Sequence, residues 1–221
     1  MLDSKELELI ISDHERWLES DGLNGKKADL SNTDLTSIDL CECNLNDANI
    51  SNSNLDDSNL SEGYFIKASF KGCSLVWADL SQADFTEADF SNADLTDADI
   101  VGTNFRLANL SKSVLSNVKA TGACFVGSNL SNAILSDLDF SGLELTSANL
   151  KNAELSNISF QDAILNNADL DSANLRNSNL MNTNLEGANL INTNLKDSIY
   201  SDKSIFPNSF IPSNYGMIKK T

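Results

Sequence analysis

Large apolar residues recur at every fifth position from Leu30 to Tyr200. Of these 35 large positions, 33 carry Leu, Ile or Phe, one carries Tyr200, and only Ala120 is small. Two residues before each of them lies a small position, where 30 of 35 residues are Ala, Ser, Thr, Cys or Gly. Neither set contains a charged residue, so we expect both sets to point into a core.

A period of five fits neither an α-helix, with about 3.6 residues per turn, nor a flat strand, with a period of about two. On an α-helix the apolar stripe would rotate by about 140° per repeat and leave no apolar face. The chain must therefore turn a corner after each short extended piece. Stacked coils then bury what a single coil cannot, so the pattern predicts an all-β solenoid.

The phenylalanines indicate the length of one coil independently. Their spacing of 20 residues is four pentapeptides, which predicts four sides and, for 35 pentapeptides, nearly nine coils. At one strand spacing per coil, the tower is roughly 42 Å tall. We expect three aromatic stacks inside it: Phe65, Phe85, Phe105 and Phe125; Phe70 and Phe90; Phe140 and Phe160.

Ala120 leaves a hole at a large position, but Val118, at the small position of the same pentapeptide, is larger than usual. Leu138 and Ile158 follow Val118 at 20-residue spacing. The larger Val118 therefore compensates for the smaller Ala120, and we expect the core volume of this pentapeptide to be conserved. Cores tolerate such a compensated exchange better than an empty site.

These pentapeptides resemble the pentapeptide-repeat protein family, whose pattern is loosely A-(D/N)-L-x-x. The runs 83–100 and 168–195 match this pattern closely, and the resemblance covers about residues 28–200. It implies a right-handed quadrilateral β-helix with tight turns at the corners. The best understood members are quinolone-resistance and topoisomerase-inhibiting proteins, described as mimics of DNA.

We expect the lower end of the solenoid to be capped, because a stack of coils exposes core and strand edges at its ends. In residues 1–27, Asp3 and Glu6 form a capping box at the start of an amphipathic helix over 3–20. The apolar face of this helix consists of Leu7, Ile10, Ile11, His14, Trp17 and Leu18.

The upper end is expected to be capped by an irregular segment. Tyr200 is the last residue in register, so the β-helix covers 28–200 and the cap covers 201–221. Prolines interrupt this tail and suit a terminator, because proline cannot donate to a strand ladder. If Phe206 and Phe210 cover the top coil, the protein is a monomer; a dimer through a terminal cap is the alternative.

The chain is acidic, with 32 Asp and Glu against 15 Lys and Arg and a formal charge of −17. Direct binding to nucleic acid or to an anionic membrane needs clustered basic residues, so both are excluded. No apolar run reaches the length of a membrane span and no signal peptide opens the chain, so we expect a cytoplasmic protein. The four unevenly spaced Cys do not make a secreted disulfide framework.

Most of this charge lies in the lower half of the tower. Residues 28–100 carry 15 acidic and 2 basic side chains, whereas residues 101–200 carry 9 and 6. Like charges one coil apart repel, so the lower half either binds a partner or serves solubility alone. The candidate interaction surface, here called the acidic belt, consists of Asp79, Asp84, Glu87, Asp89, Asp94, Asp97 and Asp99.

A second candidate surface is apolar. Val114 and Ile134 are expected to stack on one face, and Val76 and Trp77 to lie at a corner. These four residues are either a small contact patch for a partner or the scattered apolar residues that most surfaces carry.

No residue pattern indicates an enzyme, a cofactor or a metal site. His14 is the only histidine, and its place on the apolar helix face favours packing over catalysis. Cys41 and Cys43 have C-x-C spacing, but one points outward and the other inward, and no second Cys pair has zinc-like spacing. The register has no insertion that would build a catalytic cleft.

Three functions remain open. The first is a non-enzymatic acidic rod that serves as a protein–protein interaction or scaffold module for an unknown protein partner. The second is a DNA mimic that modulates a type II topoisomerase, although this chain lacks the loops and the helical C-terminal module that such relatives carry. A duplex as long as the tower has about 25 phosphates, and the coils carry a net charge of −16. The third is a structural component without a stable partner.

Overall fold

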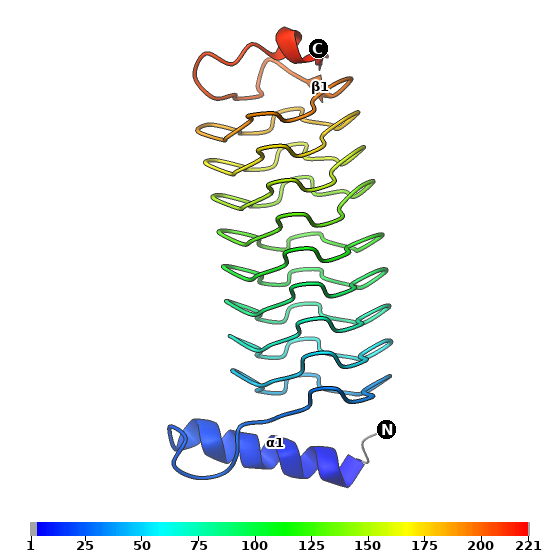
Figure 1. The fold of residues 1–221 in the computed structure, drawn as a ribbon, viewed down its shortest axis with the longest axis vertical. Helices are drawn as coiled ribbons and strands as arrows, with labels where there is room; N and C mark the ends of the chain where they lie inside the picture. The colour runs from blue at the N-terminus through cyan, green and yellow to red at the C-terminus, as the bar shows by residue number, and fades with distance from the viewer. Residues whose placement is uncertain (1–3, 221) are drawn as a thin grey trace.

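The computed structural model describes residues 4–220 as a tower of stacked coils with a helix across its lower end (Figure 1). Helix α1 spans Ser4–Glu19. The coils are followed by strand β1 (Ile199–Tyr200), the 3-10 helix η1 (Pro212–Tyr215) and strand β2 (Ile218–Lys219). Strands β1 and β2 pair in parallel.

Each pentapeptide of the tower contributes one bridging residue and one tight turn, so the walls are built from isolated β-bridges. The bridges are parallel and join residues 20 apart, such as Asp29 with Asn49 and Asn49 with Ser69; only the last, Asn184 with Ile205, spans 21 within the described residues. The bridging residue lies between the small and the large position, and its side chain faces outward. One coil therefore contains 20 residues, as the phenylalanine spacing predicts.

Every corner of the tower holds a residue with a positive φ angle. The second residue after each large position, from Asn32 to Asp197, has a φ between 55° and 73° at all 34 corners. Asn, Asp and Gly tolerate this left-handed region best, and they occupy 23 of the 34 corner positions. The polar outer positions are therefore selected partly by backbone conformation and not only by contact with water.

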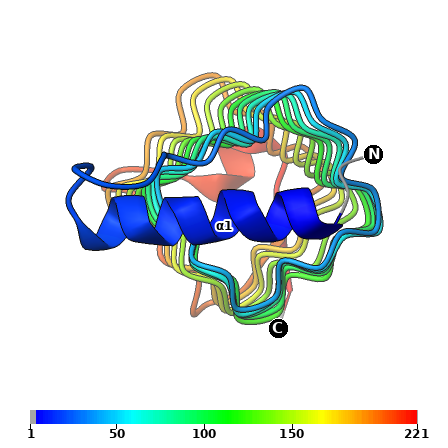
Figure 2. The same ribbon diagram turned by 90° about the horizontal axis from the view of Figure 1, so that it is seen from below.

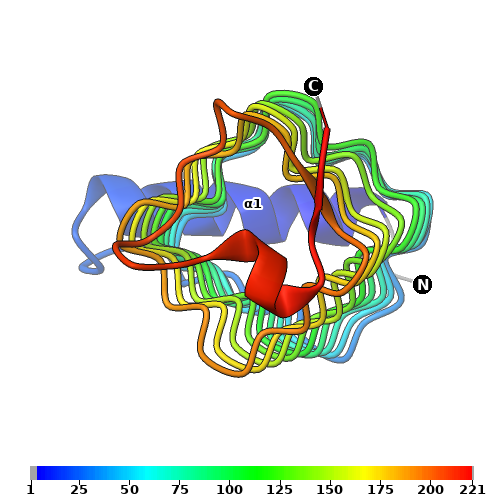
Figure 3. The ribbon, with the colours of Figure 1, turned by 90° about the horizontal axis from the view of Figure 1, so that it is seen from above.

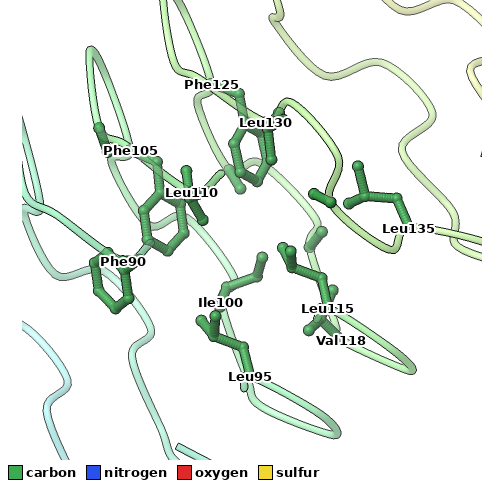
Figure 4. Close-up of a cluster of buried hydrophobic side chains, with 14 of the residues drawn as sticks. Phe90, Leu95, Ile100, Phe105, Leu110, Leu115, Val118, Phe125, Leu130 and Leu135 are labelled. Carbon is green, nitrogen blue, oxygen red and sulfur yellow. The ribbon is translucent and has the colours of Figure 1, made fainter. Parts of the chain in front are cut away.

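The interior is filled by the large and small positions. The Phe65 and Phe85 rings stack at 4.9 Å between centroids, and Phe70 and Phe90 stack at 4.8 Å. In Figure 4, Phe, Leu and Ile side chains from successive coils point into the same interior. The large positions below Ala120 are almost completely buried, since each is at most 1% exposed.

The upper phenylalanines depart from this stacking. The rings of Phe140 and Phe160 meet edge to face, at 6.1 Å and an interplanar angle of 70°, and do not form the expected parallel stack. Phe140 stacks instead on Phe125, at 5.2 Å. The coil that contains Phe140 is thus displaced from the regular order.

This displacement coincides with a break in the backbone ladder, here called the seam, between residues 117–122 and 136–141. One coil below, the N–H groups of Ile100 and Gly102 donate to the coil above, each at 2.9 Å. Within the described chain, the N–H groups of Ala120 and Gly122 make no such bond. Figure 1 shows the coils further apart at this height, on one side of the tower.

The volume swap at Ala120 therefore does not restore regular packing. Val118, Leu138 and Ile158 occupy a column of small positions that holds Ala78 and Ala98 in the coils below. Val118 is 8% exposed and Leu138 is 5% exposed, whereas Ala98 is fully buried. The ladder is intact again between Leu138 and Ile158, where Phe140 N–H donates to the Ser159 carbonyl at 2.8 Å. We therefore attribute the lost bonds to the combined change of volume at Val118, Ala120 and Leu138, and not to large residues at small positions alone.

Helix α1 lies across the lower end of the tower (Figure 2). Leu7 belongs to the core, and Ile10 and Ile11 pack against it. His14 is fully buried, and its Nδ1 accepts a hydrogen bond of 3.0 Å from the N–H of Ala28 in the first coil. Asp3 of the expected capping box lies outside the described residues.

The remaining apolar residues of α1 lie near its C-terminal end. Trp17 stacks on His14 with 5.5 Å between ring centroids, and Leu18 is half-buried. The chain then turns back at Gly25, which has a φ of +75°. A Cβ atom at this glycine would lie 2.1 Å from the carbonyl oxygen of Asp13, so no other residue fits this turn.

Residues 201–220 cross the upper end of the tower (Figure 3). Phe206 and Phe210 stack at 5.1 Å between ring centroids, and both pack against the core. The Tyr200 ring meets Phe206 edge to face, and Tyr215 stacks on Phe210. Aromatic contacts therefore connect the last coil to the tail.

Candidate functional site: the outer faces of the tower

The acidic belt runs around all four sides of the tower. Five of its residues lie at bridging positions on successive sides: Asp79, Asp84, Asp89, Asp94 and Asp99. The other two, Glu87 and Asp97, lie at corners, each with a φ of 60°. The belt therefore surrounds the tower and does not form a patch on one face.

The bridging carboxylates of the belt take part in the turns that follow them. Asp84 Oδ1 accepts hydrogen bonds from the N–H (2.9 Å) and the hydroxyl (2.6 Å) of Thr86. Asp79 and Asp89 accept in the same way from the N–H groups two residues later. These are Asx turns, so part of the acidity is explained by local backbone hydrogen bonding.

Basic residues offset only part of the belt charge. Asp79 and Asp99 are bridge partners one coil apart, and Lys119 Nζ lies 3.2 Å from Asp99 Oδ2. Glu87 lies 3.9 Å from Lys67, and both side chains are about half exposed, so this pair contributes little to stability. Within residues 4–220, the Asp97 carboxylate makes no hydrogen bond or ion pair. Glu87 and Asp97 are thus the belt carboxylates that no turn uses.

Asparagines at bridging positions form ladders between coils. Asn129 Nδ2 donates to Asn109 Oδ1, and Asn149 Nδ2 donates to Asn129 Oδ1, each at 3.1 Å. This ladder starts from Asp89, which accepts from Asn109 at 2.9 Å. Most Asn and Asp of the walls therefore have a structural role.

The structure separates the two halves of the candidate apolar patch. Val114 and Ile134 are bridge partners on one face, and Ile134 is 44% exposed. Val76 and Trp77 form the corner beside that face, two coils below Val114. Asp97 belongs to the same corner column in the coil between them. Trp77 is 62% exposed, and the four residues do not form one continuous surface.

Other large exposed apolar residues were not identified from the sequence. Tyr64 is 52% exposed at a bridging position, Leu107 is 55% exposed at a corner, and Ile191 is 63% exposed near the top. They could have been recognised from the repeat register, because each is a large apolar residue at an outward position that is usually polar.

Hollows of 280 to 460 Å³ lie at the two ends of the tower. One of 280 Å³ lies between Leu190 and the tail residues Phe210 and Tyr215. Another of 330 Å³ lies between Ile10 of α1 and Ala28 of the first coil. These hollows follow from the way the ends are covered, and the acidic belt does not line them.

The buried groups with unusual titration are held by packing. Burial raises the pKa of the Cys73 thiol to about 11, and its Sγ–H donates to the Ile50 carbonyl oxygen at 3.0 Å. Burial lowers the pKa of His14, although the Asn46 backbone and the Asp47 carboxylate act in the opposite direction. The buried Nε2 of His14 has no hydrogen bond of normal geometry.

Residues 4–220 contain neither a group of metal ligands nor a helix that could cross a membrane. No three or more His, Cys, Asp or Glu side chains in that range are grouped so that they could hold a metal ion. None of its helices has the length and apolar character that crossing a membrane requires.

The chain matches known repeat families. The family model described as pentapeptide repeats matches residues 26–62, 73–111 and 88–127, and a pentapeptide repeat region model matches residues 117–190. No curated protein matches the chain.

Solved structures with the same fold include HetL and QnrB1. HetL, a pentapeptide repeat protein involved in heterocyst differentiation regulation from the cyanobacterium Nostoc sp. strain PCC 7120, is 29% identical with a TM-score of 0.54. That match covers 83% of this chain and 92% of HetL. A trypsin-treated variant of QnrB1, a plasmid-mediated fluoroquinolone resistance protein, is 18% identical over 87% of this chain and 90% of its own, with a TM-score of 0.68. The tower is accordingly a right-handed β-helix solenoid.

Proposed function

The chain belongs to the pentapeptide repeat family, and on that premise we propose that it is a non-enzymatic interaction module whose acidic walls bind a partner protein. One observation carries this proposal. The register continues from Leu30 to Tyr200 without an insertion, and it presents the belt carboxylates outward on all four sides. Such a surface is suited to contact with a macromolecule along its length and not to enclosing a small substrate.

The test must separate the charge of the belt from its structural role. Glu87→Gln together with Asp97→Asn removes two belt charges that no turn uses. Glu144→Gln together with Glu186→Gln removes two charges outside the belt and is the matched control. We expect the native partner, captured by the full chain from its own cell and identified, to bind the belt variant more weakly and the control variant normally. Equal binding by both variants contradicts the proposal.

The second candidate is a DNA mimic that modulates a type II topoisomerase. Its support is the charge density, since a net charge of −16 on the coils is comparable with the charge of a duplex of equal length. The likeness to QnrB1 shows a shared fold and carries no information about function. Purified full-length protein is expected to inhibit DNA gyrase supercoiling, or to protect it from a quinolone. If micromolar protein has no effect in either assay, this candidate is wrong.

We further propose that the tower has about nine coils, that α1 and residues 201–220 act as its caps, and that the protein is a monomer in the cytoplasm. Supporting this location, the buried Cys73 is a free thiol, the form that the cytoplasm maintains. Supporting the monomer, Phe206 and Phe210 pack against the core at the upper end. A stable dimer in light scattering contradicts the monomer, and cell fractionation tests the location.

A further inference from the structure

Trp77 is an exposed aromatic residue at a corner of the tower. It is the second residue of the turn Val76–Trp77, with a φ of +62° and 62% of its surface exposed. Within the described chain its indole makes no ring stacking and no cation–π contact. Its backbone N–H keeps the ladder bond to the Thr96 carbonyl, at 3.1 Å. The side chain is therefore directed to the solvent from a regular, rigid backbone.

The corner position makes tryptophan an unusual choice. Bulky residues rarely adopt a positive φ, and Asn, Asp or Gly occupy most other corners. Leu107 is the comparable case, but its Cδ2 covers the next corner, since a Cβ on Gly127 would lie 2.7 Å from it. The corners next to Trp77 in its own column carry Asp57 and Asp97, which offer no apolar surface. Trp77 thus has little internal packing to explain its presence.

Carboxylates surround this corner. Asp56 Oδ1 accepts from the Val76 N–H at 3.0 Å, so one carboxylate is fixed directly beneath the turn. The three stacked segments 54–59, 74–79 and 94–99 contain six Asp and no Lys or Arg. An exposed indole in a negative field favours a cation over its ring face.

We propose that the Trp77 corner is the point at which the tower binds its partner, and that the partner contributes an arginine of a basic segment. The guanidinium stacks on the indole face while its N–H groups donate to the carboxylates of Asp57 and Asp97. Arginine fits better than lysine, because its planar guanidinium can stack and donate at the same time. Tryptophan is also among the residues that contribute most to protein interfaces. This inference rests on the proposed interaction function and specifies where on the tower the partner binds.

The test uses the full chain and a labelled, end-blocked Arg-Gly-Arg-Gly-Arg peptide, with binding followed by fluorescence anisotropy at 150 mM salt. Trp77→Asn places a corner-favoured residue on the same backbone. Leu107→Asn, at another exposed corner, is the matched control. We expect Trp77→Asn to weaken binding about tenfold and Leu107→Asn to leave it unchanged. Equal affinity of Trp77→Asn and wild type, or no binding by wild type, overturns the proposal.

Two further peptides test the chemistry of the occupant. A citrulline peptide keeps the shape of the arginine peptide without its charge, and a lysine peptide keeps the charge without the planar group. We expect citrulline to abolish binding and lysine to weaken it; equal binding of either peptide overturns the arginine assignment. The partner-capture experiment tests the proposed function, and its belt variant shares only Asp97 with the Trp77 site. A tower that captures its partner normally after Trp77→Asn overturns this site alone.

Discussion

The coils around Phe85 and the seam above Ala120 are built from the same repeat but differ in how the coils are joined. Around Phe85, the backbone N–H groups of Phe85 and Glu87 donate to the coil above, at 2.8 and 2.9 Å. At the seam the equivalent groups of Ala120 and Gly122 make no such bond within the described chain. The turns of both regions nevertheless have the same left-handed corners.

This difference shows that the ladder of this solenoid depends on its core. Where the small positions hold Ala78 and Ala98, the coils approach closely enough for every bridge. Where they hold Val118 and Leu138, with Ala120 at the large position, the bonds are lost, and they return one coil higher. Because interiors are close-packed, a few extra methylene groups change the spacing. Repeat register and coil spacing are thus separate properties.

The largest expected loss of stability comes from removing a ring from the regular phenylalanine stack. Phe85 contacts Phe65, Phe70, Phe90 and Phe105. Phe85→Ala is expected to reduce the free energy of unfolding by about 3–5 kcal/mol, because it leaves a cavity among these rings. Leu138→Ala, at the seam, is expected to cost less, because it also relieves crowding. Urea unfolding followed by circular dichroism compares the two, and equal losses contradict the distinction.

A larger side chain at position 120, the large position at the seam, is also expected to reduce the free energy of unfolding, but by less. Ala120→Leu adds side-chain volume beside Val118, which already takes part of that space. We expect a destabilisation of about 1–3 kcal/mol from overpacking. A clear rise in the melting temperature would show that a simple hole lies at Ala120.

Acid is expected to weaken the lower end of the tower and to leave the seam unaffected. The pKa of His14 is lowered from 6.5 by burial, so the unfolded chain takes up the proton first. The stability that neutral His14 supports is complete above about pH 6.5 and is lost below it, by at most about 1.4 kcal/mol per pH unit. The charged ring also cannot accept the hydrogen bond from the N–H of Ala28.

Unfolding midpoints between pH 7.5 and 5.5 measure this loss. His14→Asn keeps an acceptor near the position of Nδ1 but does not titrate in this range, so its midpoint should stay nearly constant. A wild-type midpoint that does not change over the same range would contradict the role of His14.

The smallest expected effect is local opening at the seam. An amide without its ladder bond lacks about 1 kcal/mol of protection, which corresponds to roughly fivefold faster hydrogen exchange. We expect Ala120 and Gly122 to exchange faster than Ile100 and Gly102, their equivalents one coil below. Equal exchange rates in the two pairs would show that the ladder is continuous in solution.

Much of the fold could be predicted from the sequence. The spacing of Leu30, Leu35 and the residues that follow them fixes which side chains are buried, and the spacing of Phe65 and Phe85 fixes the coil length. The seam could not be predicted in the same way. Val118 and Ala120 compensate in volume within one pentapeptide, but the spacing of coils depends on Leu138, a residue from the coil above.

For the candidate site, the belt was visible as a run of acidic residues, but the use of its carboxylates was not. Whether an Asp closes an Asx turn, as Asp84 does, depends on the backbone that follows it. The register already placed Val114 on a face and Trp77 at a corner, but it does not state how far either side chain is exposed. The φ and the exposure of Trp77, on which the proposed binding site rests, come only from the structure.

The sequence by itself determined the period of the chain, the two inward positions and the outward placement of the charge. It could do so because large apolar side chains at a fixed period leave only one arrangement that buries them all. Only the tertiary structure decided where the ladder breaks, which carboxylates the turns use and how far each corner side chain is exposed. These depend on summed volumes and distances between residues 20 apart, and no single repeat contains that information.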